Sequence, residues 1–251
     1  MPNDVLRKLA VIIPLHQEEG IAQELGMKIL ASLAENRELN YILVCDNCTD
    51  NTSVFLSAIL RNEERAHVVP SNRKKGYGNA INFGCEYALE KGFEWALITD
   101  SDMSNPLREN SKFLYEISDV NPEERIAIIK GNRFHRFPPA LYEVPIRRMI
   151  LTTLANIFCR LILNSRGGKD PTNGFRAVNL EFRAKLPTRE QGFGSIVEEL
   201  ALTLNANGQV LDLSTELRYD EAIRRTSQFT FSFETYKSYM YWVFRARKKS
   251  K

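Results

Sequence analysis

Length, composition and charge limit what this chain can be. Its 251 residues can form one large α/β domain or two small ones, with a core that needs no disulfide or structural metal. Hydrophobic residues make up 43% and charged residues 26%, as in ordinary globular proteins, and a net charge of +3 does not demand a nucleic-acid partner.

The first hundred residues alternate short apolar runs with helical patterns. Apolar runs of this length are typical of strands buried on both faces of a parallel sheet, and alternation with helices predicts βαβ units. The predicted strands are 9–13, 41–45, 67–69 and 95–99, and the predicted helices are 18–36, 52–61 and 78–91.

The second half is less regular but continues the same pattern. It contains a predicted strand at 126–130, helices at 146–163 and within 192–208, and short strands at 210–213 and 217–219. The sequence contains no repeat, low-complexity segment or Pro/Gly/Ser linker between the halves. We therefore predict one α/β domain over residues 1–228, with a mostly parallel central sheet, followed by an aromatic and basic helical tail at 229–251.

Carboxylates follow three of the predicted strands. The segments are 14–18, ending at Glu18, 46–50, beginning at Asp46, and 100–102. Ligands bind outside the carboxyl ends of strands in an open parallel sheet, so these segments are expected to share one edge. Clustered acids repel one another unless a cation or a donor-rich ligand lies among them.

Asp100-Ser101-Asp102 is the most specific of these segments. Two carboxylates one residue apart in a loop can chelate a hard divalent cation and leave positions open for phosphate oxygens. The alternative is an Asx-turn, in which the aspartate only caps a turn. Its position after a buried strand, near two other acidic loops, favours the metal site.

A basic, glycine-containing loop lies at 72–79. Lys75 and Gly76 precede a predicted helix, whose first amides favour an anion, so Lys75 suits a diphosphate. The loop is neither a Walker A sequence nor a dinucleotide fingerprint. A solvated basic loop is the alternative.

Taken in order, these segments resemble the family-2 glycosyltransferases of GT-A fold, in particular the dolichyl- and polyprenyl-phosphate mannose and glucose synthases. Further matching segments lie in the second half. The resemblance is carried by Pro14–Glu18, Val44–Asp50, Lys75–Ala80, Ile98–Pro106, Gly131–Arg133, Asp170–Arg176, Glu199 and Arg224–Ser227. Cys45 and Asn47 depart from the family's Asp and Gly, and the family's Gly and final Lys are missing around Ser227.

The resemblance implies a three-layer, Rossmann-like GT-A domain and a role for each matching residue. The nucleotide-sugar residues would be Pro14, His16, Glu18, Asp46, Lys75, Gly76, Asp100 and Ser101. Mg²⁺ or Mn²⁺ would be bound by Asp100, Asp102 and Ser104. The catalytic residues would be Asp102, Asp170 and Glu199.

The acceptor depends on whether a base is needed. A sugar hydroxyl requires a general base, for which Asp170 and Glu199 are the candidates, whereas a lipid phosphate is already ionised and needs only cations. Arginines suit phosphate geometry. The predicted acceptor-phosphate residues are Arg133, Arg148, Arg224 and Ser227. We therefore expect inverting transfer of a hexose to polyprenyl phosphate.

Two segments bear on membrane contact. The helix at 146–163 is apolar on nearly all sides, and aromatic residues between 229 and 244 precede five cations at 245–251. Such segments suit an anionic membrane surface, although core packing explains them equally well and RNA binding uses the same residue types. With no signal peptide or membrane span evident, we expect peripheral contact at the cytoplasmic face of a membrane, and no nucleic acid.

Two rival functions stay open. The same domain could glycosylate the hydroxyl of a saccharide or glycolipid in cell-surface polysaccharide synthesis. The departures at Cys45, Asn47 and around Ser227 also leave room for an inactive sugar-nucleotide-binding scaffold.

Overall fold

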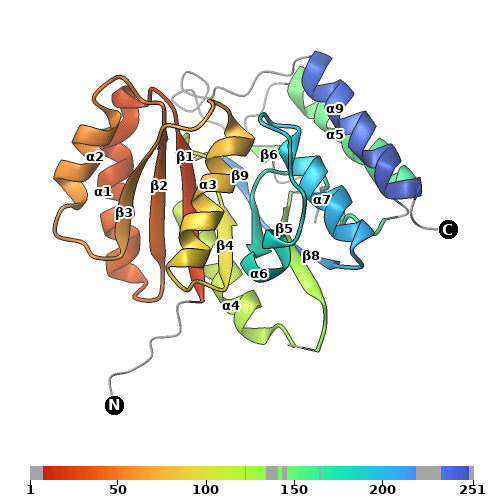
Figure 1. Cartoon of the computed structure of the whole chain (residues 1–251), viewed down its shortest axis with the longest axis horizontal. Coiled ribbons are helices and arrows are strands. Elements are labelled where there is room, and N and C mark those ends of the chain that lie inside the picture. Colours follow the sequence, from red (N-terminus) through yellow and green to blue (C-terminus); the bar gives the residue numbers. More distant parts are fainter. Residues whose placement is uncertain are drawn as a thin grey trace.

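A seven-stranded sheet forms the centre of the molecule (Figure 1). The computed structural model describes residues 8–121, 123–133, 141–142, 146–163, 165–218 and 233–248. The strands, in sheet order, are β3 (Ala66–Ser71), β2 (Asn40–Asp46), β1 (Leu9–Leu15), β4 (Trp95–Ile98), β7 (Arg176–Asn179), β5 (Ile126–Asn132) and β8 (Gln209–Ser214). All run parallel except β7, which is antiparallel to both of its neighbours.

Helices cover both faces of this sheet and make a three-layer fold. One face carries α1 (Glu19–Glu35), α2 (Thr52–Leu60) and, after the short 3₁₀ turn η1 (Leu107–Glu109), α4 (Asn110–Asp119). The other carries α3 (Tyr77–Glu90), α6 (Leu180–Ala184) and α7 (Ser195–Asn205). Outside α7 lie α5 (Ile146–Ile162) and α9 (Phe233–Lys248), side by side in Figure 1. A separate two-stranded ribbon pairs β6 (Leu141–Tyr142) with β9 (Leu217–Arg218).

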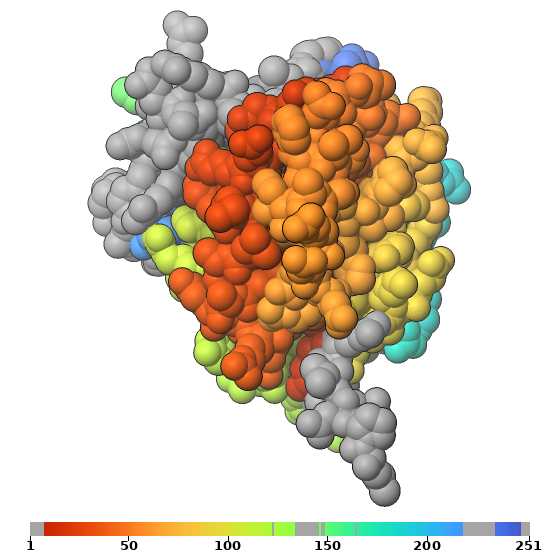
Figure 2. Space-filling view, turned by 90° about the vertical axis from the view of Figure 1, so that its left-hand side faces the viewer, coloured from red at the N-terminus to blue at the C-terminus, as the bar shows by residue number. Residues whose placement is uncertain are grey.

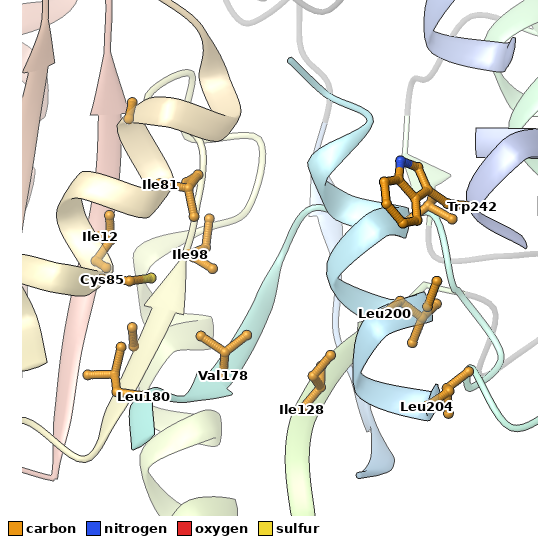
Figure 3. Close-up of a cluster of buried hydrophobic side chains, with 14 of the residues drawn as sticks. Ile12, Ile81, Cys85, Ile98, Ile128, Val178, Leu180, Leu200, Leu204 and Trp242 are labelled. Atoms are coloured by element: carbon orange, nitrogen blue, oxygen red, sulfur yellow. The ribbon is translucent and has the colours of Figure 1, made fainter. Parts of the chain in front are cut away.

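The apolar runs are strands because both of their faces are buried. In β1, Val11 and Ile13 pack towards the α1 side, whereas Ile12 packs towards α3. In Figure 3, Ile12 lies beside Ile81 and Cys85 of α3. A strand with side chains in two cores must be apolar at every position, which is the pattern that the sequence shows.

The predicted α/β fold is confirmed, including every predicted strand and helix of the first hundred residues. The sequence analysis predicted neither β7 nor α4. β7 has only four residues and begins with a buried arginine, Arg176, so its composition does not indicate a strand. In α4, the buried apolar side chains of Phe113, Leu114 and Ile117 follow helical spacing, a pattern that the sequence analysis did not use.

The C-terminal helix α9 packs into the larger fold. Its buried side chains Tyr239, Trp242, Val243 and Ala246 join the same hydrophobic cluster as α3 and α7. Figure 3 shows Trp242 near α7. The boundary expected between residues 228 and 229 lies outside the described residues. None of the helices that the structure describes is long and apolar enough to cross a bilayer.

The two ends of the molecule come from different parts of the chain. Seen from the end that carries α1 and α2, the surface consists mainly of N-terminal segments, and C-terminal segments appear only at its edges (Figure 2). Because β1, β2 and β4 run parallel, their carboxyl ends lie at the same edge of the sheet.

Candidate active site

A cleft opens at the carboxyl ends of β1, β2 and β4. Its empty volume, including solvent at its open mouth, is about 1340 Å³. The structure places all the residues predicted to bind nucleotide sugar or metal in the cleft wall. These are Pro14, His16, Glu18, Asp46, Lys75, Gly76, Asp100, Ser101, Asp102 and Ser104.

Glu18, after β1, is tied to two neighbouring loops. Its backbone amide donates to Thr52 Oγ1 at 2.8 Å, and its carboxylate accepts from Ser101 Oγ at 3.0 Å. Burial raises the pKa of Glu18 to about 7; the negative charges of Asp102 and Asp50 add to the shift, and the Ser101 hydrogen bond opposes it. With a pKa near neutrality, the Glu18 carboxyl group can donate as well as accept hydrogen bonds to a ligand at pH 7.

Asp46, at the end of β2, fixes the basic loop. Its Oδ2 accepts from the Gly76 amide at 3.0 Å, and its carbonyl oxygen accepts from His16 Nδ1 at 2.7 Å. Gly76 has a φ of 153°, and a Cβ there would lie 2.3 Å from the carbonyl oxygen of Gln191, so only glycine fits. The Asp46 contact therefore places Lys75 in the cleft wall.

Asp100, Ser101 and Asp102 enter the cleft from the end of β4. Asp102 Oδ1 accepts from the Ser104 amide at 3.0 Å, which is the Asx-turn considered from the sequence. The two interpretations coexist, because the same carboxylate also lines the cleft. Capping uses one oxygen of Asp102 and also brings Ser104 to the wall.

The donor set fits a cation shared with a ligand. No group of three or more His, Cys, Asp or Glu side chains within the described residues is disposed to hold a metal ion. A cation bound by Asp100 and Asp102 would therefore need phosphate oxygens of the ligand among its donors, as magnesium bound with nucleotide phosphates does.

The two acids expected to act as bases do not line the cleft. Asp170 is fully buried, and Arg133 donates to it through Nε at 2.6 Å, Nη2 at 2.9 Å and its backbone amide at 3.2 Å. Burial alone would lower the pKa of Arg133, but the charge of Asp170 outweighs it and raises that pKa. Arg133 itself lines the cleft.

Glu199 is equally enclosed. It accepts from Arg176 Nε and Arg183 Nε, both at 2.6 Å. Burial would raise the pKa of Glu199, but the two guanidinium groups outweigh burial and lower it to about 2. A carboxylate with so low a pKa and no place in the wall is a poor general base.

Some predicted acceptor residues cannot be placed. The side chain of Arg148 and the whole of Arg224 and Ser227 lie outside the described residues. The second half instead adds wall residues that the sequence analysis did not single out: Thr152, Thr172, Asn173, Phe193, Ile196, Leu217 and Tyr239. Thr172 and Asn173 belong to a recognised motif, and Tyr239 to the aromatic stretch, but nothing in the sequence pointed to Phe193, which stacks on Tyr77 at 4.6 Å between ring centroids.

Comparison with known proteins gives a family match. The family described as Glycosyl transferase family 2 matches residues 10–173, more than half of the chain. The polyprenol monophosphomannose synthase of Mycolicibacterium smegmatis is 28% identical over 151 residues, 59% of this chain and 54% of that protein. The dTDP-rhamnosyl transferase RfbF of Shigella flexneri is 31% identical over 114 residues, 43% of this chain and 36% of that protein. The chain thus matches about half, or less, of the length of these relatives.

Solved structures share the fold. Glucosyl-3-phosphoglycerate synthase from Mycobacterium tuberculosis, in complex with Mn²⁺, uridine diphosphate and glucosyl-3-phosphoglycerate, superposes with a TM-score of 0.68. It is 15% identical, and the match covers 96% of this chain and 80% of that one. The same enzyme with phosphoglyceric acid alone gives a TM-score of 0.67 at 17% identity, with 96% and 80% covered. At these identities the likeness establishes the GT-A fold.

Proposed function

Because the chain belongs to glycosyl transferase family 2, we propose that it moves one hexose from a nucleoside-diphosphate sugar to a polyprenyl or dolichyl phosphate, with inversion at the anomeric carbon. In this reaction a phosphate oxygen of the acceptor attacks the anomeric carbon. The bond from that carbon to the diphosphate breaks, and its electrons leave with the nucleoside diphosphate. The polyprenol monophosphomannose synthase among the relatives supports a lipid phosphate as the acceptor.

One observation carries the acceptor assignment. Every carboxylate in the described cleft wall ends or follows β1, β2 or β4, whereas Asp170 and Glu199, the candidate bases of the second half, are buried in ion pairs. The wall of the second half includes Arg133 instead. Among the described residues, the second half of the wall therefore offers a cation and no carboxylate base, which suits an acceptor that is already ionised better than a hydroxyl.

The donor would occupy the part of the cleft formed by the first half. Glu18 and Asp46 would accept hydrogen bonds from the nucleoside, and Lys75 would lie beside the diphosphate. Mg²⁺ or Mn²⁺, held by Asp100 and Asp102 with Ser104 close by, would neutralise charge on the leaving diphosphate. The solved neighbour that contains Mn²⁺ with uridine diphosphate supports this use of a cation.

We also propose that the outer face of α5 rests on a membrane surface. Ile146, Ile150, Leu154, Ile157 and Leu161 follow helical spacing and are 48% to 76% exposed. Tyr241 and Phe244 of α9 are exposed too, and α9 packs beside α5. An apolar face of this kind marks an interaction site, and a lipid acceptor would bring the cleft to a bilayer.

The function is tested by a transfer assay with paired acceptors. UDP-glucose, GDP-mannose and dTDP-rhamnose are offered with Mn²⁺, and farnesyl phosphate is compared with farnesol. We expect product from farnesyl phosphate only, and loss of product when EDTA replaces Mn²⁺. Transfer to farnesol or to a saccharide hydroxyl would favour the hydroxyl-glycosylating rival, and nucleotide-sugar binding without transfer to any acceptor would favour the scaffold.

Membrane contact is tested by flotation with vesicles of phosphatidylcholine and phosphatidylserine. Leu154→Glu together with Leu161→Glu should reduce the bound fraction about tenfold, because two apolar side chains lose their place in the interface. The matched control is Val54→Glu, since Val54 is 60% exposed on α2, away from α5 (Figure 1). Equal binding by all variants would remove α5 from the membrane surface.

A further inference from the structure

The loop from Asp170 to Gly174 forms part of the cleft wall and is held from two elements. From β5, buried Lys130 donates Nζ to a loop carbonyl at 2.8 Å, and Asn173 of the loop donates back to a β5 carbonyl at 2.7 Å. From α5, the only described side chain that hydrogen-bonds to the loop is Asn156. A loop fixed on both sides presents its side chains to the cleft in one geometry.

Both the nitrogen and the oxygen of the Asn156 side-chain amide form hydrogen bonds to this loop. Its Nδ2 donates to Asp170 Oδ1 at 2.8 Å, and its Oδ1 accepts from the backbone amide of Thr172 at 3.1 Å and from Thr172 Oγ1 at 2.9 Å. Asn156 is only 3% exposed, so water cannot replace these partners without rearrangement. A donor and an acceptor on one short planar group are properties of asparagine that neither aspartate nor leucine provides.

These contacts reach the cleft along two short paths. Thr172 lines the cleft directly. Asp170 holds the guanidinium and the backbone amide of Arg133, which also lines the cleft. One amide on α5 therefore fixes two wall residues.

We propose that Asn156 is a positioning residue for the acceptor phosphate: it orients Asp170, and through it Arg133, while holding Thr172 in the cleft wall. The inference rests on the proposed function in naming a phosphate as the group that Arg133 receives. It does not rest on that function for the connection between Asn156 and the two wall residues. The same helix presents its apolar side chains outwards and Thr152, one turn before Asn156, to the cleft. Asn156 thus joins that helix to the acceptor part of the wall.

The connection itself is tested by hydrogen–deuterium exchange, without any ligand. Asn156→Asp keeps an acceptor for Thr172 but loses the donor and sets a charge against Asp170, and Asn156→Leu removes both functions. We expect faster exchange of the amides of Arg133 and Thr172 in Asn156→Leu, and of Arg133 in Asn156→Asp. The matched control is Asn110→Leu, because Asn110 is fully buried on the opposite face of the sheet and donates to Tyr41 at 3.1 Å. Unchanged exchange at Arg133 and Thr172 in both Asn156 variants would overturn the inference.

Binding then tests the consequence. With Mn²⁺ and UDP present, both Asn156 variants should bind farnesyl phosphate about tenfold more weakly, while their affinity for UDP changes less than about twofold. In an Arg133→Gln background, Asn156→Leu should have little further effect, since residues acting through one another are not additive. Additive losses, or equal losses for UDP and farnesyl phosphate, would contradict positioning through Arg133. Failure of the unmodified protein to bind farnesyl phosphate would refute the acceptor, and the exchange experiment would still decide the role of Asn156.

Discussion

The two halves of the cleft wall use acidic residues in opposite ways. In the first half, Asp100 and Asp102 stand in the wall after a strand. In the second half, Asp170 and Glu199 lie behind the wall, where each is paired with arginine. The first arrangement offers negative charge to a ligand, and the second neutralises it inside the protein. This difference shows that an acid in a family motif can hold an arginine side chain in place as readily as it can act in catalysis.

Asp102→Asn should produce the largest effect on activity, because it removes a charge from the wall. Asparagine retains an oxygen to accept the Ser104 amide, so the turn should survive. We expect a loss of about 10²–10³-fold in kcat/KM for the nucleotide sugar, the cost of removing a group that stabilises the leaving charge. Steady-state kinetics over a Mn²⁺ titration measure it. Asp119→Asn, at an exposed position on α4, is the control; equal activity of both variants would remove Asp102 from the metal site.

Glu199→Gln should affect stability rather than chemistry. It leaves Arg176 and Arg183 buried without their shared anion, which costs about 3–5 kcal/mol of unfolding free energy. Chemical denaturation should show that loss, while kcat of the folded fraction stays near its original value. Glu181→Gln, which breaks the exposed pair with Lys185, should leave the denaturation midpoint nearly unchanged. A loss of kcat with unchanged stability would make Glu199 the base.

Glu199 should also make the unfolding free energy depend on pH in the acid range. The pKa of Glu199 is lowered to about 2 from an ordinary value of 4.5, so the stability it contributes is present above pH 4.5. That contribution is lost as the pH falls from 4.5 towards 2. Between pH 4.5 and pH 2, the unfolding free energy measured by chemical denaturation should therefore fall less steeply for Glu199→Gln than for the unmodified protein.

Arg133→Lys tests the cation that the second half presents. Lysine keeps the charge but cannot pair with both oxygens of Asp170, so its ammonium should be misplaced. We expect the KM for farnesyl phosphate to rise about 10–100-fold, with the KM for nucleotide sugar unchanged. Arg61→Lys, at an exposed position after α2, is the control. A rise in the nucleotide-sugar KM instead would assign Arg133 to the donor.

Glu18→Gln should give the smallest effect, on the stability of the ligand-free protein. Folding raises the pKa of Glu18 from 4.5 to about 7, so the stability linked to its proton is present below pH 4.5 and is lost as the pH rises through 7. Glutamine avoids that loss, and should raise the unfolding free energy at pH 8 by about 1–2 kcal/mol with little change at pH 4.5. Denaturation at the two pH values measures it; equal effects at both would show that Glu18 is not held protonated by the fold.

The sequence by itself predicted the first half of the cleft. Buried strands require continuous apolar runs, and the polar residues just after each run must lie at one edge of the sheet. Local periodicity therefore fixed both the elements and the position of Glu18, Asp46 and Asp100, whatever the rest of the chain did. The C-terminal limits of these strands agree with the structure within two residues at most.

Only the tertiary structure determined that Asp170 and Glu199 are buried in ion pairs. Asp170 is hydrogen-bonded to Arg133, which lies 37 residues earlier in the chain, and to Asn156, which lies 14 residues earlier. Glu199 is hydrogen-bonded to Arg176, 23 residues earlier. The burial and the partners of a carboxylate are set by what packs around it, and no local pattern records a neighbour so distant in the chain. The same reason explains β7: its four residues form a strand because β4 and β5 lie on either side of it, and not because of their own composition.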